Sequence, residues 1–212
     1  MKLEADGIQL SYGQHLVLSD IYLRLASGEV RGLLGRNGSG KSSLLKVIFG
    51  SLKVHASSIR IDGKATRGIS DRIKFLPQDH CFPGFLKLRS AFKIFQVIES
   101  DFEPWVVHFD NNLDQRIGQL STGQRRLFET LTILNSDSDF ALLDEPFSGL
   151  SPLLIEQLKN EISKVKGRKG ILISDHQYED VMDLCASVYL LREGKLHLLQ
   201  ERNDLIELAY LK

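Results

Sequence analysis

The sequence predicts an α/β fold that is built around a parallel sheet. An apolar run at residues 30–34 leads into a glycine-rich segment at 35–42, and a helical pattern of apolar residues follows directly. Two further apolar runs, at 140–143 and 170–174, are short and bounded, which is typical of buried parallel strands. Polar residues follow both runs, and ligands of open parallel sheets bind at such strand ends.

The length and composition indicate one globular domain over residues 1–212, with room for a small inserted subdomain. The chain is 42% hydrophobic and 25% charged, as ordinary globular proteins are. Its 27 basic residues balance 27 acidic ones, so no net field attracts a polyanion. We therefore expect no nucleic acid partner.

The sequence carries no sign of export or of membrane insertion. Cys81 and Cys185 lie far apart and lack the spacing of metal ligands, so we interpret both as free thiols in a reducing compartment. The first six residues are charged and lack the apolar core of a signal peptide. No window approaches the run of about 18 apolar residues that a spanning helix needs. We expect a cytoplasmic protein that serves a membrane process only through a partner.

The segment before the glycine-rich loop reads as strands. Residues 7–10 and 21–25 alternate, and a turn at 27–29 precedes the apolar run. Tyr12 falls in an expected turn, 23 positions before Gly35. An aromatic ring there could stack on an adenine, although on position alone a packed turn tyrosine is the simpler interpretation.

The glycine-rich segment fits the phosphate-loop pattern G-x-x-x-x-G-K-[ST] at every fixed position, because it reads Gly35-Arg36-Asn37-Gly38-Ser39-Gly40-Lys41-Ser42. Its glycines let successive N–H groups point into one concavity, and the following helix adds a partial positive charge. Lys41 would reach the β- and γ-phosphates, and the Ser42 hydroxyl would bind Mg²⁺. The strand and helix on either side argue against an incidental glycine-rich turn, so we expect nucleotide binding.

Between this loop and the middle of the chain, the pattern returns to strands. A helix is expected from Lys41 to about Gly50, and residues 57–64 read as a strand with an Asp-Gly turn. Residues 72–78 read as a strand stopped by proline, with Gln78 at the strand end where it would face a ligand.

The next segment, residues 81–114, is unusually aromatic. Helical spacing is visible at 86–98, and the aromatic residues of the segment are Phe82, Phe85, Phe92, Phe95, Phe102, Trp105 and Phe109. Such residues are ordinarily core, but a small subdomain has little core to fill. We therefore expect part of this set to form an exposed docking surface.

The second half continues the alternation of helices and strands. A helix is expected from Gln124 to about Leu134, and another begins at Ser151-Pro152, with a capping serine and a proline at the first helical position. Strands at 188–191 and 196–199 and a short terminal helix complete the chain.

Three side chains near strand ends could carry chemistry. Asp144 follows the strand at 140–143 and could anchor Mg²⁺ near Ser42, while Glu145 could accept a proton from an attacking water. The alternative for Asp144 and Glu145 is a charged turn after the strand, with no chemical role. His176 follows the strand at 170–174 and could contact a phosphate, although an isolated histidine is more often structural.

A further motif suggests the family. The helix after the middle segment opens with Leu120-Ser121-Thr122-Gly123-Gln124, which resembles the signature Leu-Ser-Gly-Gly-Gln of ATP-binding cassette (ABC) ATPases with threonine for one glycine. A capped helix N-terminus is physically a second anion site. The motifs cover nearly the whole chain in the family's order. The resemblance implies an ATP-binding core, an antiparallel β-subdomain and a helical subdomain at about 80–120.

In that family two nucleotide-binding domains close head to tail, so that each ATP lies between the phosphate loop of one and the signature of the other. The resemblance implies that Lys41, Glu145 and His176 are catalytic and that Ser42, Gln78 and Asp144 bind Mg²⁺. The residues that it implies for ATP contact are Tyr12, Gly35, Arg36, Asn37, Gly38, Ser39, Gly40, Lys41, Ser42, Ser43, Gln78, Ser121, Gly123 and Gln124.

Three departures from the family pattern bear on the site. Thr122 adds a β-branched side chain where glycine lets phosphate approach, and Ser151 stands where the family has aspartate. Only 43 positions separate Gln78 from Ser121, so the helical subdomain is expected to be short.

The sequence therefore predicts an Mg²⁺-dependent ATPase subunit of an ABC transporter. It would pair with a second copy or with a related cassette, and drive a membrane permease in trans from the inner face of the membrane. A soluble ABC switch in DNA repair, chromosome structure or translation is the alternative, but its usual coiled-coil insertions, fused twin cassettes and basic extensions are not visible. A regulatory module without turnover is disfavoured by Glu145 and His176.

Overall fold

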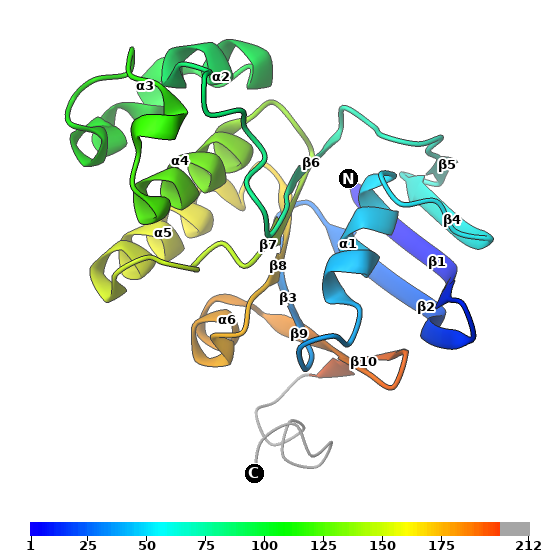
Figure 1. The fold of residues 1–212 in the computed structure, drawn as a ribbon. Coiled ribbons are helices and arrows are strands. Elements are labelled where there is room, and N and C mark those ends of the chain that lie inside the picture. The colour runs from blue at the N-terminus through cyan, green and yellow to red at the C-terminus, as the bar shows by residue number, and fades with distance from the viewer. Residues whose placement is uncertain (200–212) are drawn as a thin grey trace.

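The computed structural model of the protein describes residues 1–199. Its centre is a six-stranded sheet with the order β10-β9-β3-β8-β7-β6 (Figure 1). The strands are β3 (Val30–Leu34), β6 (Ile73–Leu76), β7 (Phe140–Asp144), β8 (Gly170–Ser174), β9 (Ser187–Arg192) and β10 (Lys195–Leu199). All neighbours are parallel except β10, which is antiparallel to β9. The predicted α/β class is confirmed, whereas the expected terminal helix lies outside the described residues.

A second, antiparallel sheet has the order β2-β1-β4-β5. It contains β1 (Lys2–Tyr12), β2 (His15–Ala26), β4 (Ala56–Ile61) and β5 (Lys64–Ala65). Both β1 and β2 are longer than the runs predicted at 7–10 and 21–25. Register shifts interrupt the period-two alternation of apolar residues, so the sequence pattern shows only part of each strand. The expectation for Tyr12 is also corrected, since it ends β1 opposite His15 and the turn begins at Gly13.

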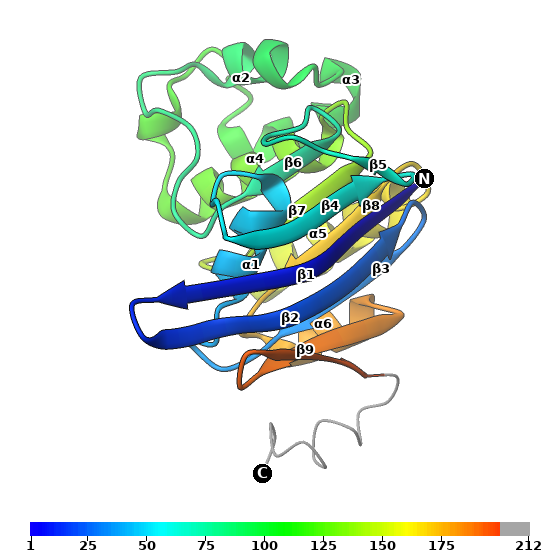
Figure 2. The same ribbon diagram turned by 90° about the vertical axis from the view of Figure 1, so that its right-hand side faces the viewer.

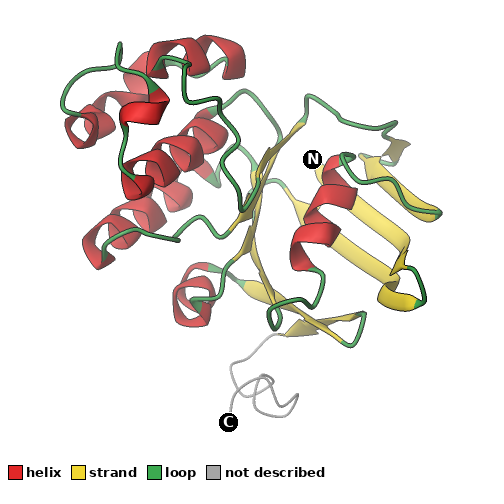
Figure 3. Ribbon diagram, in the orientation of Figure 1, coloured by secondary structure: helices red, strands yellow, loops and turns green. Residues whose placement is uncertain are grey.

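Helices cover the central sheet on both faces (Figures 1 and 3). One face carries α1 (Lys41–Phe49) and the antiparallel sheet, which Figure 2 shows in front of the central strands. The other carries α4 (Thr122–Asn135), α5 (Pro152–Val165) and α6 (Tyr178–Leu184). Leu33 and Leu172 pack on the α1 side, whereas Leu34 and Ile173 pack on the other. Burial on both faces explains why these strands are continuous apolar runs.

The middle segment forms an outer group of short helices beside α4 (Figure 1). They are α2 (Leu88–Phe95), α3 (Glu99–Phe102) and the 3₁₀ helices η1 (Glu103–Phe109) and η2 (Ile117–Gln119). The ring of Phe128 on α4 lies within 6.0 Å, centroid to centroid, of four others, those of Phe82, Phe92, Phe102 and Phe109. The expectation that part of the aromatic set is exposed is therefore limited to one residue. Phe85, at 75% exposure, is the one aromatic residue of that set that faces outward.

The described part of the chain shows no helix that is long and apolar enough to cross a bilayer. Cys81 and Cys185 are free thiols, as predicted. Burial raises the pKa of each to about 12, so neither is an activated thiolate.

Phe128→Ala tests the aromatic centre of the helical group. We expect it to lower the free energy of unfolding by about 3–5 kcal/mol, because the cavity would lie among four rings. Phe85→Ala is the matched control and should change stability by no more than about 0.5 kcal/mol. Urea unfolding measures both, and equal small effects would show that the ring cluster does not hold this layer.

Lys169, which precedes β8, makes stability depend on pH. The residue is 1% exposed, its Nζ donates to the Ser136 carbonyl at 2.8 Å, and burial lowers its pKa to about 7. Above pH 7 the unfolded chain binds the proton that the folded chain has released, so stability rises with pH. Relative to Lys169→Met, the wild type should gain up to about 1.4 kcal/mol per pH unit between pH 7 and 10. Urea unfolding at pH 7, 8 and 9 measures this difference. A difference in unfolding free energy between the two proteins that stays constant with pH would contradict the prediction.

Candidate functional site

A pocket of about 540 Å³ opens where the phosphate loop meets the end of the β1–β2 hairpin and the carboxyl ends of β6 and β7. Its lining residues are Tyr12, His15, Val17, Asn37, Gly38, Gly40, Lys41, Ser42, Ser43, Gln78 and Glu145. The structure thus gathers most of the residues that the sequence predicted for nucleotide contact. His15 and Val17 were not predicted, because only the pairing of β1 with β2 places them beside the loop.

The phosphate loop joins β3 to α1 and depends on glycine at two points. Gly38 and Gly40 have φ angles of 79° and 106°, which are left-handed values that favour glycine. A Cβ on Gly40 would lie 2.7 Å from Val17 Cγ1, so the loop also packs against β2 too closely for a side chain. This geometry is the one in which loop N–H groups and the α1 N-terminus can bind phosphate.

Lys41 supplies a buried positive charge at the start of α1. Its Nζ donates to the Gly35 carbonyl at 2.7 Å and to the Arg36 carbonyl at 3.3 Å. Burial lowers the pKa of Lys41, and the carboxylates of Asp144, Glu145 and Asp175 oppose that shift. The ammonium group therefore lies in the field of three acidic side chains from the ends of β7 and β8.

Asp144 ends β7 and is 1% exposed. Burial raises its pKa, an effect that its hydrogen bond with the Ser42 side chain opposes. One carboxylate oxygen, Oδ2, has no hydrogen-bond partner among the described residues. A buried carboxylate oxygen beside a hydroxyl fits a hard cation such as Mg²⁺, which takes one or two protein ligands together with substrate phosphates. No group of three or more His, Cys, Asp or Glu side chains able to hold a metal ion lies within residues 1–199.

Glu145 follows β7 with a φ of 56°, which is left-handed and uncommon for a glutamate. Its Oε2 accepts a hydrogen bond from Gln78 Nε2 at 3.2 Å. The turn thereby directs the carboxylate into the pocket beside the glutamine at the end of β6, where a water or a phosphate could lie.

Asp175 was missed by the sequence analysis. It is fully buried between β8 and His176, and burial raises its pKa. Its carboxylate accepts from the Phe147 and Gln177 N–H groups, both at 3.1 Å. It thus joins the loop after Glu145 to the loop that carries His176. The available signal was an acid directly after an apolar strand, the same arrangement as Asp144.

His176 follows β8 and is exposed. Its side chain is 56% exposed, and its Nδ1 lies 3.3 Å from Asp175 Oδ1. It is not among the described residues that line the pocket.

The predicted signature lies at the start of α4. The Ser121 hydroxyl accepts from the Gln124 N–H at 3.2 Å, and the Gln124 side chain accepts from the Ser121 N–H at 2.9 Å, forming a capping box. Gly123 fits tightly, since a Cβ there would lie 2.7 Å from the Gly149 carbonyl. None of Ser121, Gly123 and Gln124 is among the described residues of the pocket wall.

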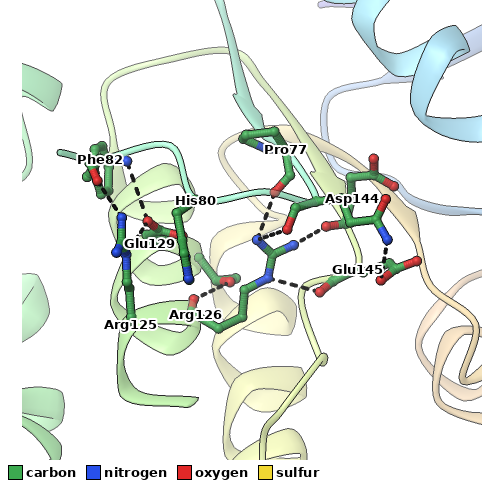
Figure 4. Close-up of polar contacts among 10 residues, drawn as sticks. Pro77, His80, Phe82, Arg125, Arg126, Glu129, Asp144 and Glu145 are labelled. Carbon is green, nitrogen blue, oxygen red and sulfur yellow. Dashed lines mark hydrogen bonds and ion pairs between the residues drawn. The ribbon is translucent and has the colours of Figure 1, made fainter. Parts of the chain in front are cut away.

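Arg126 is a second residue that the sequence analysis missed. It is 4% exposed, and its guanidinium donates to backbone carbonyls at the ends of both β6 and β7 (Figure 4). The signal was a charged residue in the apolar part of a helix, which local spacing alone does not distinguish from a solvated arginine.

The fold and this pocket define a nucleotide-binding protein of the phosphate-loop class. Comparison with known proteins narrows the class, because a family model described as "ABC transporter" matches residues 18–148. The chain belongs to that family, as an ATP-binding subunit that hydrolyses ATP.

Curated relatives are also described as ATP-binding proteins. LptB of Haemophilus influenzae, a lipopolysaccharide export system ATP-binding protein, is 31% identical over 92% of this chain and 88% of its own length. The ribose import ATP-binding protein RbsA of Bacillus subtilis is 27% identical over 92% of this chain but 44% of its own length. A solved ATP-binding subunit of an ABC transporter superposes with a TM-score of 0.83 at 24% identity, covering 99% of this chain and 94% of that one.

Tyr12 provides a test of the adenine side of the pocket. Tyr12 is 56% exposed, and its hydroxyl lies 3.4 Å from Ser43 Oγ. Tyr12→Phe should keep ATP affinity, whereas Tyr12→Ala should weaken it about tenfold, since stacking on a base contributes about 1–3 kcal/mol. Calorimetric titration with ATP measures the difference. Equal affinities of the two variants would exclude stacking by this residue.

Proposed function

We propose that the pocket binds ATP with Mg²⁺ and that its residues hydrolyse the nucleotide. The observation that carries the proposal is the convergence of Lys41, at the start of α1, with Asp144 and Glu145, at the end of β7, at one phosphate loop. Tyr12 would stack on the adenine, and the residues at 35–43 would hold the phosphates. Ser42, Asp144 and the Gln78 side-chain oxygen would hold Mg²⁺, which when bound neutralises charge on the β- and γ-phosphate oxygens.

Hydrolysis would use Glu145 as the general base. Its carboxylate would take a proton from a water as the water oxygen attacks the γ-phosphorus, and the bond from that phosphorus to the bridging oxygen of ADP would break. Lys41 and the loop N–H groups would stabilise the charge that develops on the phosphate oxygens. His176 would donate a hydrogen bond to the γ-phosphate on closure, since its loop is joined to that of Glu145 through Asp175.

Assembly in pairs would complete the site. The capped N-terminus of α4 is an anion site that does not line the pocket of its own chain, which supports use by a second cassette. Ser121, Gly123 and Gln124 of that cassette would then contact the γ-phosphate. The Thr122 side chain would restrict how closely the phosphate can approach this helix N-terminus. Ser151 caps α5 by accepting from the Leu154 N–H, and it is compatible with either a homodimer or a heterodimer.

The mechanical output would be transmitted to a transmembrane permease bound in trans, with the cassette peripheral on the inner face of the membrane. The relatives named for lipopolysaccharide export and ribose import support this transport function over the soluble switch considered as the alternative. Because those names differ in cargo and direction, we assign cargo selection to the permease.

Glu145→Gln tests both the base and the pairing. With saturating ATP and Mg²⁺ it should lower turnover by about a hundredfold or more and accumulate an ATP-bound dimer, because binding is kept while proton removal is lost. Sedimentation velocity and phosphate release measure the two effects. Glu156→Gln, an exposed change on α5, is the control and should behave as the wild type. A Glu145→Gln protein that stays monomeric would exclude the shared site, and one with normal turnover would exclude Glu145 as the base.

A further inference from the structure

Arg126 joins two loops that carry the proposed hydrolytic residues (Figure 4). Its Nη1 donates to the Pro77 carbonyl at 2.7 Å, its Nε donates to the Glu145 carbonyl at 3.0 Å, and its Nη2 donates to the Asp144 carbonyl. The guanidinium is planar with donors in a fixed fork, so it can hold several carbonyls at set positions.

This contact lies where the sheet stops holding β6 and β7 together. The last paired residues of the two strands are Leu76 and Leu143. Pro77 follows on β6 and has no N–H, so the hydrogen-bond ladder cannot continue through it. Arg126 donates to the carbonyl of that proline and to those of Asp144 and Glu145. Its side chain thus takes the place of the missing hydrogen bonds between the two strands. The side chains of Gln78 and Glu145, which meet at 3.2 Å, lie directly beyond this point.

Nearby carboxylates stabilise the buried charge of Arg126. Burial lowers its pKa, and Glu129, one turn further along α4, opposes that shift most strongly. Glu129 is itself fully buried and accepts from Arg125 Nε at 3.3 Å and from the Phe82 N–H at 3.4 Å. A desolvated cation needs a nearby negative charge, and Glu129 supplies one to Arg126.

We propose that Arg126 is a positioning residue for ATP hydrolysis, which fixes the distance between the Gln78 loop and the Asp144-Glu145 turn. The inference rests on the proposed role of Glu145, because Arg126 acts through that residue and does not itself line the nucleotide pocket. Its position on the signature helix means that the same side chain connects α4 to the hydrolytic turn.

Arg126→Lys keeps the charge but replaces the planar fork by a compact ammonium group, which cannot hold three carbonyls in the same geometry. We expect kcat for ATP to fall about ten- to a hundredfold, the scale of a misplacement near 1 Å, with KM within about twofold of the wild type. Arg125→Lys is the matched control on the same helix. Arg125 donates to the Phe82 carbonyl and to Glu129, and we expect its variant to keep kcat within about twofold.

A double-variant cycle with Glu145→Gln distinguishes positioning from general damage. If Arg126 acts through Glu145, then Arg126→Lys should leave the residual single-turnover rate of Glu145→Gln nearly unchanged. A full additional loss in the double variant would overturn the proposal, and so would a normal kcat in a folded Arg126→Lys protein. Normal turnover by Glu145→Gln alone would instead refute the proposed function.

Folding is measured in the same set by thermal melting with and without ATP, and Arg126→Gln is included as a neutral second variant. A folded Arg126→Gln protein should show the same loss of kcat with KM retained. If neither variant reaches a folded state, Arg126 has a structural role and the positioning proposal fails.

Discussion

The rest of the site depends on the interactions of the buried Lys41 ammonium group with backbone carbonyls and nearby carboxylates. A desolvated charge is stable only beside opposite charges or good hydrogen-bond acceptors, and Lys41 has both. Its acidic neighbours come from the ends of β7 and β8, so the central sheet must bring three segments together at one edge. The parallel order β3-β8-β7 does this directly, because the carboxyl ends of parallel strands meet on one side.

The same arrangement supplies one wall of the proposed phosphate site. In the proposed complex the N–H groups of the loop, Lys41 and the α1 N-terminus would stabilise phosphate from that wall. The capped N-terminus at Ser121, which we propose as a second anion site, begins α4, and α4 lies across the central sheet from α1 (Figure 1). In the proposed assembly a second cassette supplies the other wall of the phosphate site. ATP then joins the two subunits and is also the substrate.

Sequence reasoning succeeded where short spacing determines the chemistry. The phosphate loop, the strand that ends at Asp144 and the cap at Ser151 are local patterns, and the structure places each element as predicted. It failed where contacts join distant segments: Arg126 looks like any helical arginine until β6 and β7 end beside it. Aromatic composition likewise cannot reveal that Phe128 provides a centre around which the other rings pack.

In the proposed assembly one chain carries only half of a hydrolytic site. The most direct test is the ATP turnover of the wild-type protein per subunit, measured over a range of protein concentrations in which sedimentation velocity reports the fraction of dimer. Turnover per subunit should rise with the fraction of dimer and approach zero in the monomer. A monomer that hydrolyses ATP as fast as the dimer would contradict it.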